Sequence, residues 1–496
     1  MPFLMGHIFK SGYKTIISLH KGKVNMRLKR INLLPALLGI VLLSAFTVSA
    51  EQEKKPNIIF ILTDDLGFNQ IGAYGDTVIK TPNLDDMANN GIRFDQAYAG
   101  NTVCSPSRVS LFTGRDGRYM SNNSNTVQLE EIDITMAHVL KHADYDTALF
   151  GKYSIGSKMG VTDPLAMGFD TWYGMYSILE GHRQYPKILW RDGVKERITE
   201  NEGGRKGAYA SELFTNEAIS YIKQERENPF FIMLAYPSPH ADLAVPKQYS
   251  DQYDLPETPY LGMQNGIPTD KYAWYYPEPV EKPNAVLAGM VTALDDYVGR
   301  IMSELEASGQ LDNTIIVFTS DNGPHDEGGA DPEFFKAAGP YKGQKRDLYD
   351  GGIHVPMLIQ WPEKIKKGRV DNTPWLFADV LPTFADIAEV NLDLVPRVKT
   401  NGVSIKDLLS DSPVKMAERT LYWEFSKQVG DPNSGVIGDT YQAARRGEWK
   451  AVRYGFDAPL ELFNITSDPG ERHNLAAKQK SIAKEFYDMF EKYKSE

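Results

Sequence analysis

The sequence of 496 residues contains only one cysteine, Cys104, so no disulfide can form within a single chain. This excludes the small secreted domains that depend on several disulfides. A lone cysteine is either a small buried apolar residue or a reactive group. The surroundings of Cys104 are therefore the first place to search for a function.

The chain also lacks internal repeats, low-complexity tracts and, with one exception, long apolar runs. Its apolar share of 42% and its charged share of 24% are typical of soluble globular proteins, not of disordered or collagen-like chains. The length suits one large domain with a satellite, or two domains.

The exception is the apolar run 33–46, which basic residues precede and Val48-Ser49-Ala50 follows. The run is shorter than the roughly 20 residues of a membrane-spanning helix, and it has the flanks of a secretory signal peptide. We predict that residues 1–50 are a signal region whose true start is Met26. The mature protein would be secreted or periplasmic, with no membrane association after cleavage.

Positive charge is scarce in the rest of the chain. Residues 1–50 hold seven Lys and Arg and no acidic residue, so cleavage would change the net charge from −11 to about −18. Such a surface repels nucleic acid, which we exclude as a partner. An anionic substrate would need a local basic pocket.

Four short apolar runs are each followed at once by polar residues: 58–62 by Thr63-Asp64-Asp65, 147–150 by Gly151-Lys152, 230–235 by a segment ending in His240, and 315–319 by Ser320-Asp321-Asn322. Nearly continuous apolar runs predict strands that are buried on both faces of a parallel sheet. Apolar residues at helical spacing predict a helix over 284–308. This alternation predicts an open α/β sheet, whose functional groups gather at the carboxyl ends of its strands.

The pattern changes after about residue 412. Four short strand candidates, 420–425, 442–446, 450–453 and 460–463, precede a helical stretch over 481–493. They predict a small antiparallel sheet with a helix. We therefore divide the chain into a catalytic domain, 51–412, and a C-terminal subdomain, 413–496.

Two pairs of oxygen-bearing residues follow strands, Asp64-Asp65 and Asp321-Asn322. Asp after a strand can simply form a turn or cap a helix. Two such pairs at one sheet edge instead favour a hard cation, calcium or magnesium, over zinc.

Cys104 opens the segment Cys104-Ser105-Pro106-Ser107-Arg108, and a helix is predicted from Pro106 to Thr113. The N-terminal end of a helix favours an anionic nucleophile or an anionic substrate. The residues alone leave two readings open, a reactive thiol and a buried cysteine at a helix end.

This pentapeptide resembles the C-x-P-x-R signature of the type I, formylglycine-dependent sulfatases, which belong to the alkaline phosphatase superfamily. Segments 56–67, 81–85, 91–94, 111–115, 319–323, 349–356, 446–450 and 468–475 resemble the same family in the same order. The resemblance implies an alkaline-phosphatase-like α/β fold, with a large mixed sheet between helices and a small C-terminal antiparallel sheet plus helix.

The resemblance also implies a cofactor and a maturation partner. A formylglycine-generating enzyme would oxidise Cys104 to an aldehyde. The modified residue would bind one divalent cation, for which we expect calcium, together with Asp64, Asp65, Asp321 and Asn322.

Four further residues receive catalytic roles from the resemblance. Arg108 would orient the aldehyde hydrate, and Lys152 and Lys345 would bind sulfate oxygens. His240 would protonate the leaving alcohol. One hydroxyl of the hydrate would attack sulfur, and the other would then expel sulfate.

The sequence departs from the family at Ser154, where most members have a histidine that takes a proton from the hydrate. Serine is no base near neutral pH, so either water assisted by Ser154 or another residue such as His325 must act. The candidate substrate contacts are Ser154, His182, Arg183, Tyr185, Lys187, His325 and Lys342.

The predicted function is hydrolysis of sulfate esters on a carbohydrate, with a polysaccharide such as carrageenan as the specific hypothesis. Two alternatives stay open. One is a phosphonate monoester hydrolase or phosphodiesterase of the same superfamily, against which the signal region counts because those enzymes are typically cytoplasmic. The other is a non-catalytic glycan-binding homologue, against which the intact catalytic set counts.

Overall fold

The computed structural model describes residues 54–120, 123–410, 415–427 and 440–494. The predicted signal region and the predicted domain boundary at residue 412 lie outside these ranges. Within them, no helix is both long enough and apolar enough to cross a membrane.

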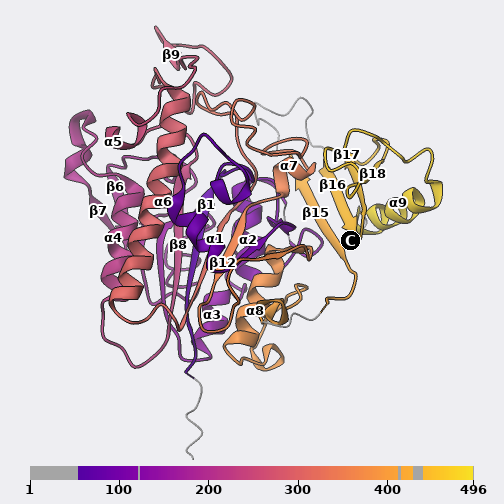
Figure 1. The fold of residues 1–496 in the computed structure, drawn as a ribbon, viewed down its shortest axis with the longest axis horizontal. Helices are drawn as coiled ribbons and strands as arrows, with labels where there is room; N and C mark the ends of the chain where they lie inside the picture. Colours follow the sequence, from indigo (N-terminus) through magenta and orange to yellow (C-terminus); the bar gives the residue numbers. More distant parts are fainter. Residues whose placement is uncertain (1–53, 121–122, 411–414, 428–439, 495–496) are drawn as a thin grey trace, which may run out of the picture. The chain divides into compact units, whose positions relative to one another are not determined.

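A ten-stranded mixed sheet forms the centre of the fold (Figure 1). Its five central strands run parallel in the order β11 (Thr314–Ser320), β1 (Asn57–Asp64), β8 (Phe230–Pro239), β4 (Asp146–Lys152) and β5 (Thr171–Met175). The hairpin β6 (Ile188–Arg191) and β7 (Val194–Arg197) adds antiparallel strands at one side. The other side carries β12 (Met357–Gln360), β2 (Ile92–Phe94) and β13 (Arg369–Asp371). The predicted large mixed sheet is confirmed.

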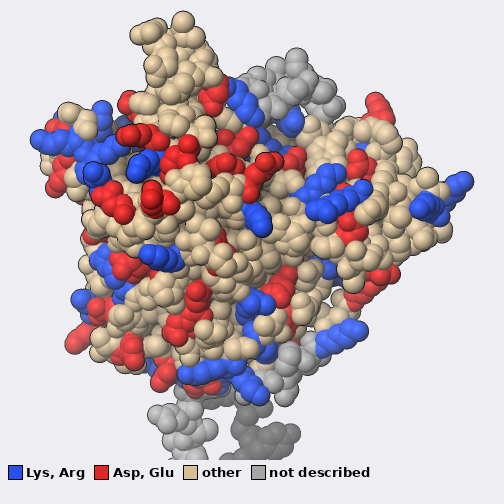
Figure 2. All heavy atoms as spheres, turned by 45° about the horizontal axis from the view of Figure 1, so that its top comes forward, with Lys and Arg blue, Asp and Glu red and all other residues tan. Residues whose placement is uncertain are grey.

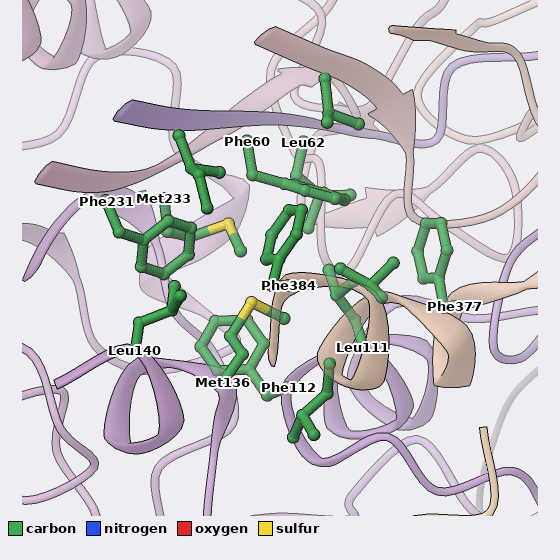
Figure 3. Close-up of a cluster of buried hydrophobic side chains, with 14 of the residues drawn as sticks. Phe60, Leu62, Leu111, Phe112, Met136, Leu140, Phe231, Met233, Phe377 and Phe384 are labelled. Carbon is green, nitrogen blue, oxygen red and sulfur yellow. The ribbon is translucent and has the colours of Figure 1, made fainter. Parts of the chain in front are cut away.

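Helices cover both faces of the sheet, because alternate residues of each central strand point to opposite sides. One face packs on α2 (Cys104–Thr113), α3 (Met136–Lys141) and α8 (Val380–Ile387). Figure 3 shows this packing, with Phe60, Leu62, Phe231 and Met233 of the strands against Leu111, Phe112, Met136, Leu140 and Phe384 of the helices. The other face packs on α1 (Pro82–Asn89), α4 (Ala210–Ile222) and α6 (Pro283–Ala307).

The C-terminal sheet is antiparallel, as predicted, in the order β15 (Thr420–Ser426), β16 (Thr440–Arg446), β17 (Trp449–Tyr454) and β18 (Glu461–Asn464). One of its faces packs on α9 (Lys480–Lys494) through Phe486 and Phe490. Its other face, with Trp423 and Phe425, packs on the part of the main domain that includes Tyr98 and Ile353. The remaining short strands and α-helices are β3 (Ala97–Tyr98), β9 (Met263–Gln264), β10 (Ile267–Pro268), β14 (Trp375–Leu376), α5 (Lys247–Ser250) and α7 (Asp350–Ile353).

Helix α2 begins two residues earlier than predicted. Val103 has an extended backbone and its carbonyl accepts a hydrogen bond from Ser107 N at 3.2 Å, so the first helical residue is Cys104 and not Pro106. The side chain of Cys104 therefore projects from the very first turn of the helix, where the backbone N–H groups concentrate positive potential.

Candidate active site

The polar residues that follow the central strands lie together at one edge of the sheet. Asp64 ends β1 and Lys152 ends β4, whereas His240 and Asp321 come directly after β8 and β11. These four strands are parallel neighbours, so their carboxyl ends meet at the same edge. All four side chains are buried.

A short network fixes the acidic residues. Asp65 N donates to Asp321 Oδ1 at 3.2 Å, and Asn322 Nδ2 donates to Asp65 Oδ1 at 2.7 Å. Asp65 has a left-handed backbone, with φ of 67°, which turns the chain sharply at the end of β1. The two predicted oxygen pairs are thereby joined into one cluster.

Three basic side chains face this cluster. Arg108 donates from Nε to Asp321 Oδ2 at 2.9 Å and from Nη1 to the Lys152 carbonyl at 2.6 Å. Lys152 donates to Asp64 Oδ2. Lys345 Nζ lies 2.7 Å from Asp65 Oδ2. These contacts gather three basic side chains at one sheet edge, where they supply the local positive charge that an anionic substrate needs on an acidic protein.

Burial and neighbouring charges give the carboxyl groups of Asp321 and Asp64 very different pKa values. Burial raises the pKa of Asp321 to about 7, and the charge of Asp64 adds to the rise. Burial also acts to raise the pKa of Asp64, but the charges of Lys152 and its basic neighbours hold that pKa well below the usual range. The raised pKa means that the charged form of Asp321 is destabilised in this buried setting. A further cation beside Asp321 would stabilise that charged form.

The side chains fit a hard divalent cation. Ligand atoms of Asp64, Cys104 and Asp321 all lie within 4.8 Å of one another, and so do those of Asp64, Asp65 and His240. Asp64 Oδ1 and Asn322 Oδ1 are buried and accept no hydrogen bond from any residue that the structure describes. Two buried oxygens without donors beside further carboxylates are suited to a metal ion.

Cys104 is 2% exposed, and its Sγ lies 4.0 Å from Asn125 Oδ1. Burial raises the pKa of its thiol above the ordinary value, although Lys152 acts in the opposite direction. Reactive cysteines have a lowered pKa. The thiol itself is thus a poor nucleophile here, so the reading of Cys104 as a reactive thiolate is disfavoured.

Three histidine rings are stacked beside the cluster. The centroid of the His240 ring lies 4.2 Å from that of His182 and 5.5 Å from that of His325. Lys345 Nζ lies 2.9 Å from His240 Nε2. Burial, followed by the charge of Lys345, lowers the pKa of His240 well below its ordinary value.

His325 is held by the backbone on both ring nitrogens. Its Nε2 faces the Pro239 carbonyl at 3.2 Å, and its Nδ1 accepts from Glu327 N at 3.1 Å. Ser154 donates instead to the Ser177 carbonyl at 3.2 Å. Both candidates for the role of the missing histidine therefore already contact the backbone, so water assisted by Ser154 and His325 both stay predictions.

Two predicted contacts lie next to the cluster. Gly181 sits against it so closely that an added Cβ would come within 2.7 Å of Ser154 Oγ and 2.9 Å of Lys152 Cε. The short helical turn Glu180–His182 therefore brings His182 to the site. Burial, followed by the charge of His240, lowers the pKa of His182 well below its ordinary value.

Among the residues that it describes, the structure shows no contact with the acidic cluster for the side chains of Arg183, Tyr185, Lys187 and Lys342, whose role as substrate contacts stays a prediction. Arg183 and Lys187 are exposed, and the Tyr185 ring packs on Tyr209. Lys342 Nζ lies 3.6 Å from the centroid of the Tyr349 ring, facing the C-terminal sheet. His354 is buried, and its ring is stacked on that of Tyr341, with 4.2 Å between the centroids.

Sequence reasoning missed Glu327, which is 3% exposed. Its carboxylate contacts Lys345 Nζ at 3.0 Å and accepts from Arg346 Nη1 and from the Tyr276 hydroxyl, each at 2.8 Å. Its position two residues after His325 was the only sequence signal that pointed to it.

Comparison with known proteins agrees with this geometry. The family model described as Sulfatase matches residues 56–390. The chain belongs to the sulfatase family. A second model, N-sulphoglucosamine sulphohydrolase, C-terminal, matches residues 342–496 of this sulfatase. The protein is thus a sulfuric ester hydrolase, as predicted.

Similar proteins cover nearly the whole sulfatase chain. An N-acetylglucosamine-6-O-sulfatase of Bacteroides thetaiotaomicron is 27% identical over 93% of this chain and 91% of its own. An ulvan-active sulfatase of Formosa agariphila is 27% identical over 94% of this chain and 87% of its own. The crystal structure of Ps i-CgsB in complex with k-i-k-neocarrahexaose has a TM-score of 0.71 and 26% identity, covering 89% of this chain and 93% of the other. The predicted alkaline-phosphatase-like fold is confirmed.

Proposed function

We propose that this protein is an exported sulfatase that hydrolyses sulfate esters on a sulfated carbohydrate, a polysaccharide such as carrageenan. The observation that carries the proposal is the buried Cys104 beside three carboxylates and three basic side chains at one sheet edge. The relatives support the substrate class, because they are named for a sulfated amino sugar and for ulvan, and a similar structure holds a neocarrahexaose. Export rests on the signal-like region 1–50.

The group proposed to start the reaction is a formylglycine made from Cys104 by a maturation enzyme. Its hydrate would supply one hydroxyl to attack sulfur, with the sugar alcohol leaving as the S–O ester bond breaks, and a second hydroxyl whose loss of a proton would release sulfate as the aldehyde re-forms. Asp64, Asp65, Asp321, Asn322 and the modified residue would hold a calcium ion, which would supply positive charge to the sulfate oxygens.

The remaining steps belong to side chains of this chain. Lys152 and Lys345 approach the cluster from different strands and loops, so they can hold two sides of one sulfate group. Arg108 keeps the Asp321 carboxylate in place through two of its nitrogens. Lys345 Nζ and His240 Nε2, 2.9 Å apart, would together deliver the proton that the leaving oxygen takes up.

Mass spectrometry of the tryptic peptide 94–108 tests the proposal. Protein made together with a maturation enzyme should carry an aldehyde in place of the thiol, and Cys104→Ser should bind substrate but turn over negligibly. An unmodified peptide in fully active enzyme would contradict the mechanism. Faster turnover of phosphate or phosphonate esters than of the matching sulfate esters would favour the phosphonate hydrolase alternative.

A further inference from the structure

A lobe over residues 260–280 rises beside the active site. Its ends pair through an antiparallel bridge between Tyr260 and Val280, and it contains the hairpin β9–β10. The lobe stands at the top of Figure 1 and comes forward in Figure 2, where its side chains are mostly uncharged while acidic and basic side chains gather below it. On the face that Figure 2 shows, the lobe stands out as a largely uncharged projection above a charged surface.

Two buried tyrosines anchor the lobe to the active site. The Tyr272 hydroxyl donates to Asp326 Oδ1 at 2.6 Å, and the Tyr276 hydroxyl donates to Glu327 Oε2 at 2.8 Å. The Tyr276 ring lies 6.2 Å from the His240 ring, edge to face. Glu327 in turn contacts Lys345, so the anchor reaches a side chain proposed to bind sulfate.

Between these anchors, two large aromatic side chains face solvent. Trp274 is 68% exposed and Tyr275 is 46% exposed, whereas Ala273 beside them is fully buried. The rings of Tyr275 and Tyr276 lie 6.5 Å apart. Because two residues span at most about 7 Å of chain, the Trp274 backbone also lies within that distance of Tyr276.

Exposing two consecutive aromatic side chains to water is energetically unfavourable. Two consecutive exposed aromatic side chains close to a polar site are candidates for contacts with a ligand. The turn 271–275 is short and held at both ends, so the rings lose little further freedom when a ligand packs on them. Their chemistry suits a flat ligand surface of C–H groups, not the sulfate itself.

We propose that Trp274 and Tyr275 form a sugar-binding subsite, on which the pyranose ring that adjoins the sulfated sugar of a glycan is stacked. The C–H face of a pyranose packs on an aromatic ring, and the largely uncharged lobe is compatible with a sugar ring that carries no sulfate. The inference rests on the proposed function, since it requires a substrate longer than one sugar.

The test compares two substrates in Trp274→Ala and Tyr275→Ala. We expect kcat/KM on a sulfated carrageenan oligosaccharide to fall about tenfold for each variant. We expect kcat/KM on para-nitrophenyl sulfate to stay unchanged, because that ester ends at the sulfate site. Trp274→Phe should recover part of the loss, and Leu394→Ala, which removes an exposed apolar side chain of a different surface segment, should change neither substrate.

The outcomes separate the subsite from the proposed function. Unchanged kcat/KM on the oligosaccharide in both alanine variants would overturn the subsite and leave the glycan sulfatase proposal standing. An equal loss on both substrates would also overturn it, since the rings would then support the catalytic centre itself. A wild-type enzyme that cleaves para-nitrophenyl sulfate but no sulfated glycan would overturn both proposals.

Discussion

Replacing Glu327 by glutamine tests the one buried acidic group of the site that no sequence motif indicated. The substitution keeps the size of the side chain and an acceptor for the Tyr276 hydroxyl. It removes the negative charge that lies 3.0 Å from Lys345 Nζ and 2.8 Å from Arg346 Nη1. Lys345 would keep its contacts with Asp65 and His240 but lose the charge that positions it from the other side.

The contacts set the expected size of the effect. A hydrogen bond to a charged group contributes about 1.5 to 3 kcal/mol. If that contribution positions Lys345 for the transition state, kcat/KM should fall by about 10- to 100-fold. The loss should appear mainly in kcat, because Glu327 touches Lys345 and is not itself proposed to touch the substrate.

A series of aryl sulfates with leaving groups of rising pKa is the appropriate assay. Lys345 contacts His240 Nε2, so a displaced Lys345 should weaken proton delivery, and the loss in Glu327→Gln should grow as the leaving group becomes more basic. Glu333→Gln, which changes an exposed carboxylate in the same stretch of chain, is the matched control. A loss that is equal for all leaving groups, or no loss at all, would refute the positioning role.

Three further predictions follow from the site and its supports. Asp321→Ala should lower bound metal and activity together, as measured by metal analysis and turnover, whereas full activity after exhaustive chelation would exclude a required cation. Because Ser154 cannot act as a base, rapid-quench kinetics should show a burst of desulfated sugar before the steady state, and a linear time course would contradict this. Lys450→Met should destabilise the protein by about 3 to 5 kcal/mol in urea unfolding, because Lys450 Nζ lies 2.6 Å from Asp350 and 2.8 Å from Glu471 in a buried setting. The exposed pair Lys484 and Asp488 provides the control, since Lys484→Met should cost at most about 0.5 kcal/mol.

The sequence predicted the centre of the fold better than its edges. Strands such as β1 and β11 are buried on both faces, so their continuous apolar runs gave bounds within two residues of those observed. The outer strands β6, β7 and β13 are short and partly exposed, so they lack the continuous buried apolar runs of the central strands. The prediction that the sheet is mixed, with antiparallel as well as parallel strands, therefore came only from the family resemblance.

Some residues of the candidate site could likewise be predicted from the sequence, and others could not. Residues at strand ends, such as Asp64 and Lys152, could be predicted because the end of a parallel strand has a known place in the sheet. Glu327 and Tyr276 are 51 residues apart and meet only through the packing of two loops, which leaves no periodic signal. Lys342 is predicted near the substrate only because it flanks the motifs, and the structure adds that its ammonium group lies over the Tyr349 ring.

If Cys104 is converted to formylglycine as proposed, the burial of α2 requires that the conversion precede folding. All ten residues of the helix, Cys104 and Arg108 included, are buried between the sheet, α8 and the loops around them. A maturation enzyme that must grip the pentapeptide could reach it only while the chain is still unfolded. A chain that folded before Cys104 was modified would keep an unmodified thiol buried in a stable protein. The fraction of active molecules would then be decided during synthesis and export, before the first substrate is met.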